Sequence, residues 1–127
     1  MAHLLVIDDD AAVRQTMRRM LLDAGHSVVE ADNGATGIAQ VTQGAIDVVL
    51  TDIIMPGTEG VETIQQIRRL RPNMKIIAMS GSYSSDAYLS AAAKLGAQAI
   101  LKKPFRTAEL RDTINQVLAQ PSPNRTS

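Results

Sequence analysis

The sequence predicts an α/β fold, a doubly wound sandwich in which helices cover both faces of a five-stranded parallel sheet. Short apolar runs alternate five times with segments of helical spacing, and the connections between them are short. A chain of 127 residues, 45% of them hydrophobic, can form one such domain with a substantial core but not two. We therefore expect one domain over residues 1–120 and a disordered polar tail over 121–127, which contains two prolines.

The first half of the chain is expected to hold two strand–helix pairs. His3–Ile7 is interpreted as a buried strand. Apolar residues recur at helical spacing over 12–24, Asp10 is suited to cap this helix, and Gly25 is placed to end it in a left-handed turn. The elements expected next are a strand over 27–31, a turn at Asn33-Gly34 and a helix over 35–43.

The second half is expected to add three further strands and helices. The apolar run over 48–50 leads into Thr51 and Asp52, so a buried third strand delivers a carboxylate to its C-terminal end. The helix after it should turn Leu70 toward the sheet with the preceding apolar residues, and Arg68 should belong to a solvated, basic helix end. The expected elements are helices over 59–70, 86–95 and 107–120 and strands over 75–79 and 97–101.

Composition excludes several classes of function. Lys plus Arg and Asp plus Glu each number 13, so no net charge attracts the chain to nucleic acid or to an anionic membrane. The absence of cysteine excludes disulfides and zinc thiolate sites and fits a reducing cytosol. His3 and His26 have no ligand partner nearby in the sequence and are interpreted as structural or exposed. No run resembles a signal peptide or a membrane span, so we expect a cytoplasmic protein.

Carboxylates are predicted to meet at one edge of the sheet. The flavodoxin-like strand order 2-1-3-4-5 has its switch point between the first and third strands, where ligands bind outside the carboxyl ends. Asp8 and Asp9 follow the first strand, and Asp52 ends the third. Alone, each could be a turn or capping residue. Together they repel one another, and a small divalent cation relieves the repulsion, so we expect an oxygen-only Mg²⁺ site.

Such a site suits phosphoryl transfer. One carboxylate can attack a phosphoryl group while the metal neutralises its oxygens. Lys103, which follows the fifth strand and precedes proline, is the candidate for a second positive charge. Ser80, at the end of the fourth strand, can donate a hydrogen bond to a third oxygen, although a serine in a loop is the ordinary interpretation.

An ordered set of four features resembles the receiver domain of two-component response regulators. They are Asp8-Asp9 after the first strand, LTDIIMPG with Asp52 after the third, Ser80 after the fourth, and KPF with Lys103 after the fifth. The set spans nearly the whole chain. The resemblance implies a phosphorylation-dependent switch of a two-component system or phosphorelay. Such a domain is not an enzyme for a separate substrate, although it catalyses its own phosphorylation and slow dephosphorylation.

The resemblance also implies ligands and partners. Asp52 would accept a phosphoryl group from a phosphohistidine of a sensor histidine kinase or a histidine phosphotransfer protein. Asp9 would bind Mg²⁺ directly, Asp8 largely through water, and the backbone carbonyl of Ile54 would complete the protein ligands. The signal would pass to an effector protein, which the sequence does not identify, through the surface of the fourth helix, fifth strand and last helix.

One position departs from the family pattern. The resemblance implies that Ser80 is the switch hydroxyl and that Lys103 contacts the phosphoryl group. Three residues before this lysine the family usually carries an aromatic side chain that turns inward, and this chain has Ile100. We therefore expect activation to be transmitted mainly by the loop after Ser80 and the following helix.

Three other interpretations compete with the receiver. Asp8 and Asp10 also imitate the Asp-x-Asp of haloacid-dehalogenase-like phosphatases, with Asp8 as nucleophile and Asp10 as acid/base, but Ala12 stands where that motif usually has Thr or Val. A receiver fold used only for docking would not need three mutually repelling carboxylates. Flavin or nucleotide binding would need backbone amides facing phosphate after the first strand, where this chain has three aspartates.

Overall fold

The computed structural model describes residues 2–53, 60–81, 90, 93–94 and 96–121. The strands form one parallel sheet in the order β2-β1-β3-β4-β5, as the sequence predicts. The elements are β1 (His3–Ile7), α1 (Ala11–Asp23), β2 (Ser27–Ala31), α2 (Gly34–Gln43), β3 (Val48–Asp52), α3 (Gly60–Leu70), β4 (Lys75–Ser80), β5 (Ala99–Lys102) and α5 (Thr107–Ala119). The helix expected over 86–95 and the tail expected over 121–127 fall largely outside the described residues.

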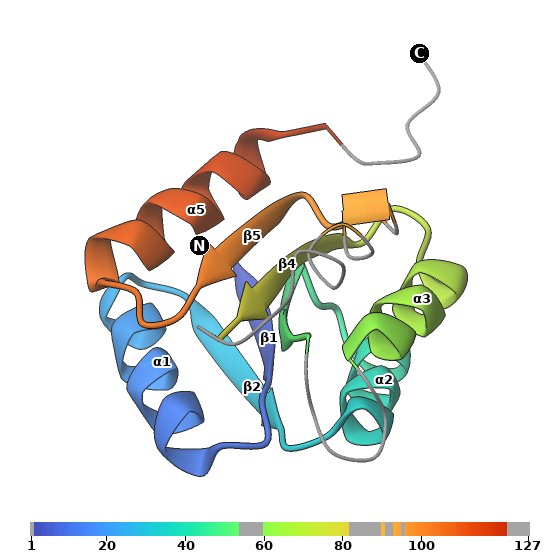
Figure 1. The fold of residues 1–127 in the computed structure, drawn as a ribbon, viewed down its shortest axis with the longest axis horizontal. Helices are drawn as coiled ribbons and strands as arrows, with labels where there is room; N and C mark the ends of the chain where they lie inside the picture. Colours follow the sequence, from blue (N-terminus) through green and yellow to red (C-terminus); the bar gives the residue numbers. More distant parts are fainter. Residues whose placement is uncertain (1, 54–59, 82–89, 91–92, 95, 122–127) are drawn as a thin grey trace.

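Helices cover both faces of the sheet, α1 and α5 on one side and α2 and α3 on the other (Figure 1). Neighbouring residues of each strand supply opposite faces, because side chains alternate along a strand. Leu4 and Val6 pack with the apolar side of α1 and α5, whereas Leu5 and Ile7 pack with that of α2 and α3. All four are fully buried. Burial on both faces is why the three central strands β1, β3 and β4 contain continuous apolar runs, whereas the edge strand β2 includes Glu30.

Local signals place the ends of the first two helices. The Asp10 carboxylate accepts hydrogen bonds from the backbone N–H groups of Ala12 and Val13, at 2.9 and 3.3 Å, and so caps α1 as predicted. Gly25 follows α1 with a φ of 91°, the left-handed turn that the sequence predicts. At the predicted Asn33-Gly34 turn, Asn33 instead caps α2 by accepting from the N–H of Thr36 at 2.8 Å.

Two predictions for α3 are wrong. Leu70 is 43% exposed, whereas Arg68 is half-buried. At about 100° per residue, Leu70 lies about 120° around the helix from the buried Ile64, but Arg68 lies only about 40° from it. The guanidinium of Arg68 donates hydrogen bonds to the carbonyls of Pro72, Met74 and Gly96. Arg68 therefore ties α3 to the chain before β4 and before β5, and it is not part of a solvated end.

Candidate phosphoryl-acceptor and metal site

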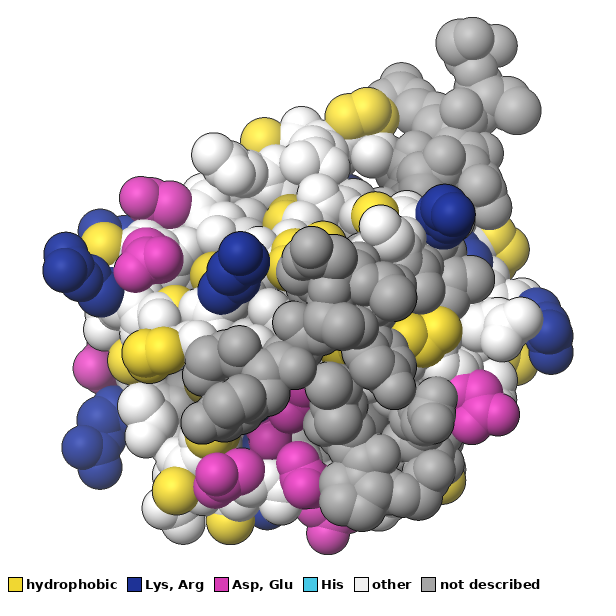
Figure 2. Space-filling view, viewed as in Figure 1, with side chains coloured by type: hydrophobic (Ala, Val, Ile, Leu, Met, Phe, Trp, Pro, Cys, Tyr) yellow, Lys and Arg dark blue, Asp and Glu magenta, His cyan; other side chains and the backbone are white. Residues whose placement is uncertain are grey.

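The carboxyl ends of β1 and β3 bring three carboxylates together. These strands are neighbours, with Ile7 paired to Thr51, so the following residues Asp8 and Asp52 lie side by side. One carboxylate oxygen from each of Asp8, Asp9 and Asp52 lies within 4.8 Å of the others. Asp8 and Asp52 are buried, while Asp9 is exposed. Acidic side chains gather along the lower edge of the molecule in Figure 2, the edge at which β1 ends in Figure 1.

Lys103 reaches into this cluster from the loop after β5. Its Nζ lies 2.5 Å from Asp8 Oδ2 and 3.0 Å from Asp52 Oδ2. Its backbone N–H donates to the carbonyl of Ser80 at 2.7 Å, which fixes the loop to the end of β4, and the Lys103–Pro104 peptide is cis. Burial alone would lower the pKa of the ammonium. The hydrogen bonds and charges of the two carboxylates outweigh burial, so the pKa is raised above its ordinary value of 10.5.

Ser80 lies at the same edge of the sheet. It is the last residue of β4, is 1% exposed and pairs in register with Lys102 of β5. Adjacent β3 ends at Asp52, and the Ile53 N–H that follows donates to the carbonyl of Met79 at 2.9 Å. Ser80 therefore belongs to the strand ends that border the carboxylates. Ile54, for which a backbone ligand is predicted, lies outside the described residues.

The backbone around the carboxylates is fixed by residues that the sequence patterns did not indicate. Arg14 donates from Nη1 to the carbonyl of Asp8 at 2.6 Å, and its Nε lies 3.3 Å from Glu30 Oε1. Gly60 opens α3 with its N–H on the carbonyl of Ile53 at 2.8 Å, and a Cβ there would lie 2.2 Å from the carbonyl oxygens of both Asp52 and Ile53. A glycine at a helix start signals such close backbone approach. No linear motif indicated Arg14 or Glu30.

The donor set fits Mg²⁺. This ion prefers oxygen ligands, keeps several waters and usually binds through one or two carboxylates and substrate phosphate oxygens. Three carboxylate oxygens within 4.8 Å supply such ligands, and exposed Asp9 leaves one side of the cluster open to solvent. Asp10 does not join the cluster, because its carboxylate caps α1. This weighs against a phosphatase with Asp10 as acid/base.

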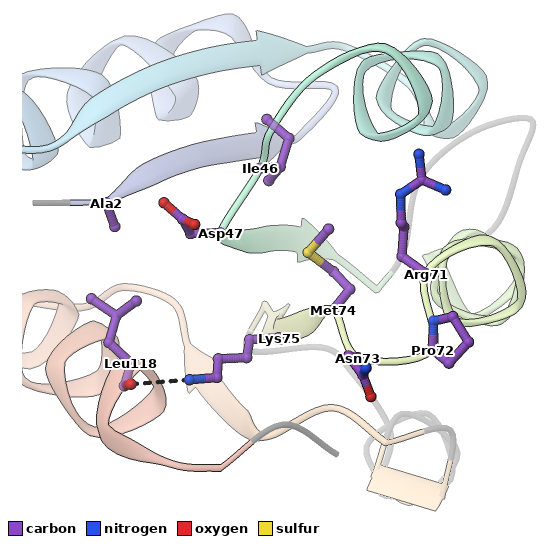
Figure 3. Close-up of a pocket in the computed structure, with 9 residues that line it drawn as sticks. All are labelled: Ala2, Ile46, Asp47, Arg71, Pro72, Asn73, Met74, Lys75 and Leu118. Carbon is purple, nitrogen blue, oxygen red and sulfur yellow. Dashed lines mark hydrogen bonds between the residues drawn. The ribbon is translucent and has the colours of Figure 1, made fainter. Parts of the chain in front are cut away.

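A depression of about 590 Å³ lies at the opposite edge of the sheet, lined in part by Asp47 before β3 and Lys75 at the start of β4 (Figure 3). Its charged groups already bind backbone. Asp47 accepts from the N–H of His3 at 2.8 Å, Lys75 donates to the carbonyl of Leu118 at 3.0 Å, and Arg71 donates to the carbonyl of Thr42 at 3.3 Å. This depression therefore contributes nothing to the carboxylate site.

Comparison with known proteins identifies the family. A family model described as the response regulator receiver domain matches residues 4–115. The chain belongs to this family. The chemotaxis protein CheY of Thermotoga maritima is 32% identical over 116 residues, which are 91% of this chain and 96% of CheY. A crystal structure of a CheY-like receiver domain protein from Methanospirillum hungatei JF-1 has a TM-score of 0.89 and 30% identity, covering 93% of this chain and 94% of that one.

Receiver domains also form parts of larger proteins. The DNA-binding transcriptional regulator NtrC of a Bradyrhizobium strain is 35% identical over 120 residues, which are 93% of this chain but 24% of NtrC. The chain thus spans about a quarter of the length of the NtrC relatives that it matches. Membership confirms the predicted receiver domain of two-component systems and sets aside the phosphatase and flavin interpretations. In the part of the chain that the structure describes, no helix has the length and hydrophobicity to cross a membrane.

Proposed function

We propose that this receiver domain is a phosphorylation-dependent switch whose Asp52 accepts a phosphoryl group from a phosphohistidine. The donor would be a sensor histidine kinase or a histidine phosphotransfer protein. The observation that carries the proposal is the position of Asp52 at the end of β3, 3.0 Å from the Lys103 ammonium and within 4.8 Å of the carboxylate oxygens of Asp8 and Asp9. The absence of cysteine fits a cytoplasmic location.

Asp52 is favoured over Asp8 as the acceptor because its side chain keeps some solvent-exposed surface and that of Asp8 keeps none. The side chain of Asp52 is 11% exposed, whereas that of Asp8 is fully buried. Asp8 Oδ1 accepts from the N–H of Asp10 at 2.9 Å, and its Oδ2 contacts Lys103. Asp8 is thus held as part of the site, while an oxygen of Asp52 attacks phosphorus.

The transfer is one displacement at phosphorus. A bond forms between an Asp52 oxygen and phosphorus while the bond from phosphorus to the histidine nitrogen breaks. The electron pair of the broken bond stays on that nitrogen, and the ring, which carries a proton on its other nitrogen, leaves as neutral imidazole. Mg²⁺, held by Asp8, Asp9, Asp52 and the Ile54 carbonyl, would supply positive charge for the phosphoryl oxygens. Lys103 supplies a second charge from its place beside Asp52, and the Ser80 hydroxyl donates to a remaining oxygen.

Two surfaces support binding of partner proteins. An apolar groove of about 460 Å³ runs between α1 and the loop after β5, lined by Val13, Met17, Met20 and Phe105 among others, and Lys103 lies at its border. A donor that delivers a phosphoryl group beside Lys103 would cover this groove. On β5, Ile100 is 36% exposed, which fits an effector that contacts this strand. The effector itself is not identified.

The test is intact mass after incubation with a small phosphodonor and Mg²⁺. We expect one phosphoryl adduct that requires Mg²⁺ and is lost in Asp52→Asn but kept in Asp10→Asn, since Asp10 only caps α1. Peptide mapping should place the adduct on Asp52. An adduct on Asp8 or Asp10 would overturn the assignment. If neither small donors nor phosphohistidine donors modify the chain, it is a docking module.

A further inference from the structure

An arginine outside the carboxylate cluster holds the backbone beneath it. The Arg14 side chain is 17% exposed and donates from Nη1 to the carbonyl oxygen of Asp8 at 2.6 Å. Its Nε lies 3.3 Å from Oε1 of Glu30 on β2, so the guanidinium bridges β2 and the loop after β1. Arg14 itself belongs to α1. One side chain thus joins three elements at the base of the acidic pair.

Both backbone polar groups of Asp8 form hydrogen bonds. Its N–H donates to the carbonyl of Ala31, at the end of β2, at 3.1 Å, and its carbonyl accepts from Arg14. A hydrogen bond with a charged donor is stronger than one between neutral groups. The loop is short, since Asp8 follows β1 directly and Asp10 already caps α1. Because Asp9 directly follows Asp8, a fixed Asp8 backbone also fixes the position from which the Asp9 backbone continues.

Glu30 gives the arginine its orientation and offsets part of its charge. A lone guanidinium near a divalent cation would oppose binding of that cation, because like charges repel at this range. The Glu30 carboxylate offsets part of the Arg14 charge, so the pair holds the loop with a smaller penalty than a lone guanidinium. Arg18 also pairs with Glu30, through Oε2 at 3.5 Å, but its other contact is the carbonyl of Val28 at 3.2 Å and not the Asp8 loop.

We infer that Arg14, oriented by Glu30, is a positioning residue that holds Asp8 and Asp9 in the arrangement that binds Mg²⁺. This rests on the proposed function, since it takes the acidic cluster to be the Mg²⁺ site. The carboxylates of the cluster explain what binds the ion. The Arg14–Glu30 pair explains how the Asp8 backbone keeps its place before the ion arrives, while Lys103 offsets the repulsion between the side chains.

The test is a calorimetric Mg²⁺ titration of the full chain and its variants. Loss of an outer-shell partner typically weakens metal binding by about 10- to 100-fold, so we expect about tenfold weaker binding in Arg14→Ala. Arg14→Lys should bind with intermediate affinity, since an ammonium can hold the Asp8 carbonyl without the fork that also engages Glu30. Arg18→Ala is the matched control, because it loses an ion pair with the same Glu30, and it should bind like the wild type.

A second measurement separates positioning from general stability. In the metal-free proteins, amide exchange of residues 8–11 should be faster in Arg14→Ala than in Arg18→Ala, at equal global stability. Unchanged Mg²⁺ affinity in folded Arg14→Ala would overturn the inference and leave the proposed function intact. A wild type that binds no Mg²⁺ would overturn both. If Arg14→Ala does not fold, Glu30→Gln replaces it and should weaken Mg²⁺ binding by a smaller factor, whereas wild-type affinity there would overturn the inference.

Discussion

Replacing Lys103 by methionine should measure how much this lysine stabilises the metal-free protein against repulsion between the carboxylates. At an effective dielectric constant of about 20, two carboxylate oxygens at the outer limit of 4.8 Å repel by about 3.5 kcal/mol, and an ammonium 3.0 Å from a carboxylate attracts it by about 5.5 kcal/mol. Lys103 contacts two of the three carboxylates. It therefore offsets the repulsion as long as no metal is bound. Methionine has a similar volume but removes both the charge and the hydrogen-bond donors of the ammonium.

We expect Lys103→Met to lower the free energy of unfolding of the metal-free protein by about 3 kcal/mol, the lower end of the range for removing one partner of a buried ion pair. Mg²⁺ at a hundred times its dissociation constant should restore about 2.7 kcal/mol. The variant should also bind Mg²⁺ more tightly than the wild type, because the ammonium and the ion share the carboxylates of Asp8 and Asp52.

The assay is urea unfolding with a chelator and with saturating Mg²⁺, for wild type and variant. The pH dependence gives an independent check. Because the folded-state pKa of Lys103 is raised, its stabilisation is present below pH 10.5 and is lost as the pH rises through the folded-state pKa. The free energy of unfolding of Lys103→Met should not show this decrease at high pH. Equal stability in chelator, or equal stabilisation of both proteins by Mg²⁺, would refute the view that Lys103 and the metal share the carboxylates.

Three further predictions follow from single contacts. Gly60→Ala should destabilise the fold by about 3 kcal/mol, because the added Cβ meets backbone, while Gly81→Ala, with open space, should not; equal urea midpoints would contradict this. Asp9→Asn should weaken Mg²⁺ binding by more than about tenfold in calorimetry yet raise the metal-free melting temperature, since one repelling charge is gone. Burial and the nearby chain terminus lower the pKa of His26, whose Nδ1 accepts from the N–H of Ala2 at 3.0 Å, so stability should fall as the pH drops below 6.5. His26→Gln should remove that fall in thermal unfolding, and its persistence would exclude His26 as the cause.

The fold was predictable because its signals are local. Apolar runs of strand length, capping by Asp10 and the left-handed turn at Gly25 each depend on neighbouring residues, and the structure confirms them. The doubly wound fold followed from the alternation and short connections of strands and helices, while the strand order was taken from the flavodoxin-like arrangement, and the structure confirms it. The prediction for Leu70 was wrong because this residue lies about 120° around α3 from Ile64. The prediction for Arg68 was wrong because apolar spacing does not reveal which backbone carbonyls a long side chain can reach.

The candidate site was likewise predictable in part from the sequence. The sequence by itself determined which residues stand at strand ends, and parallel strands bring those ends to one edge, so Asp8, Asp9, Asp52, Ser80 and Lys103 were named before any contact was known. Only the tertiary structure decided that Lys103 lies between Asp8 and Asp52 and that the Asp8 carbonyl rests on Arg14. A strand end is a property of local sequence. The distance between atoms from separate elements depends on how those elements pack, and no spacing along the chain encodes it.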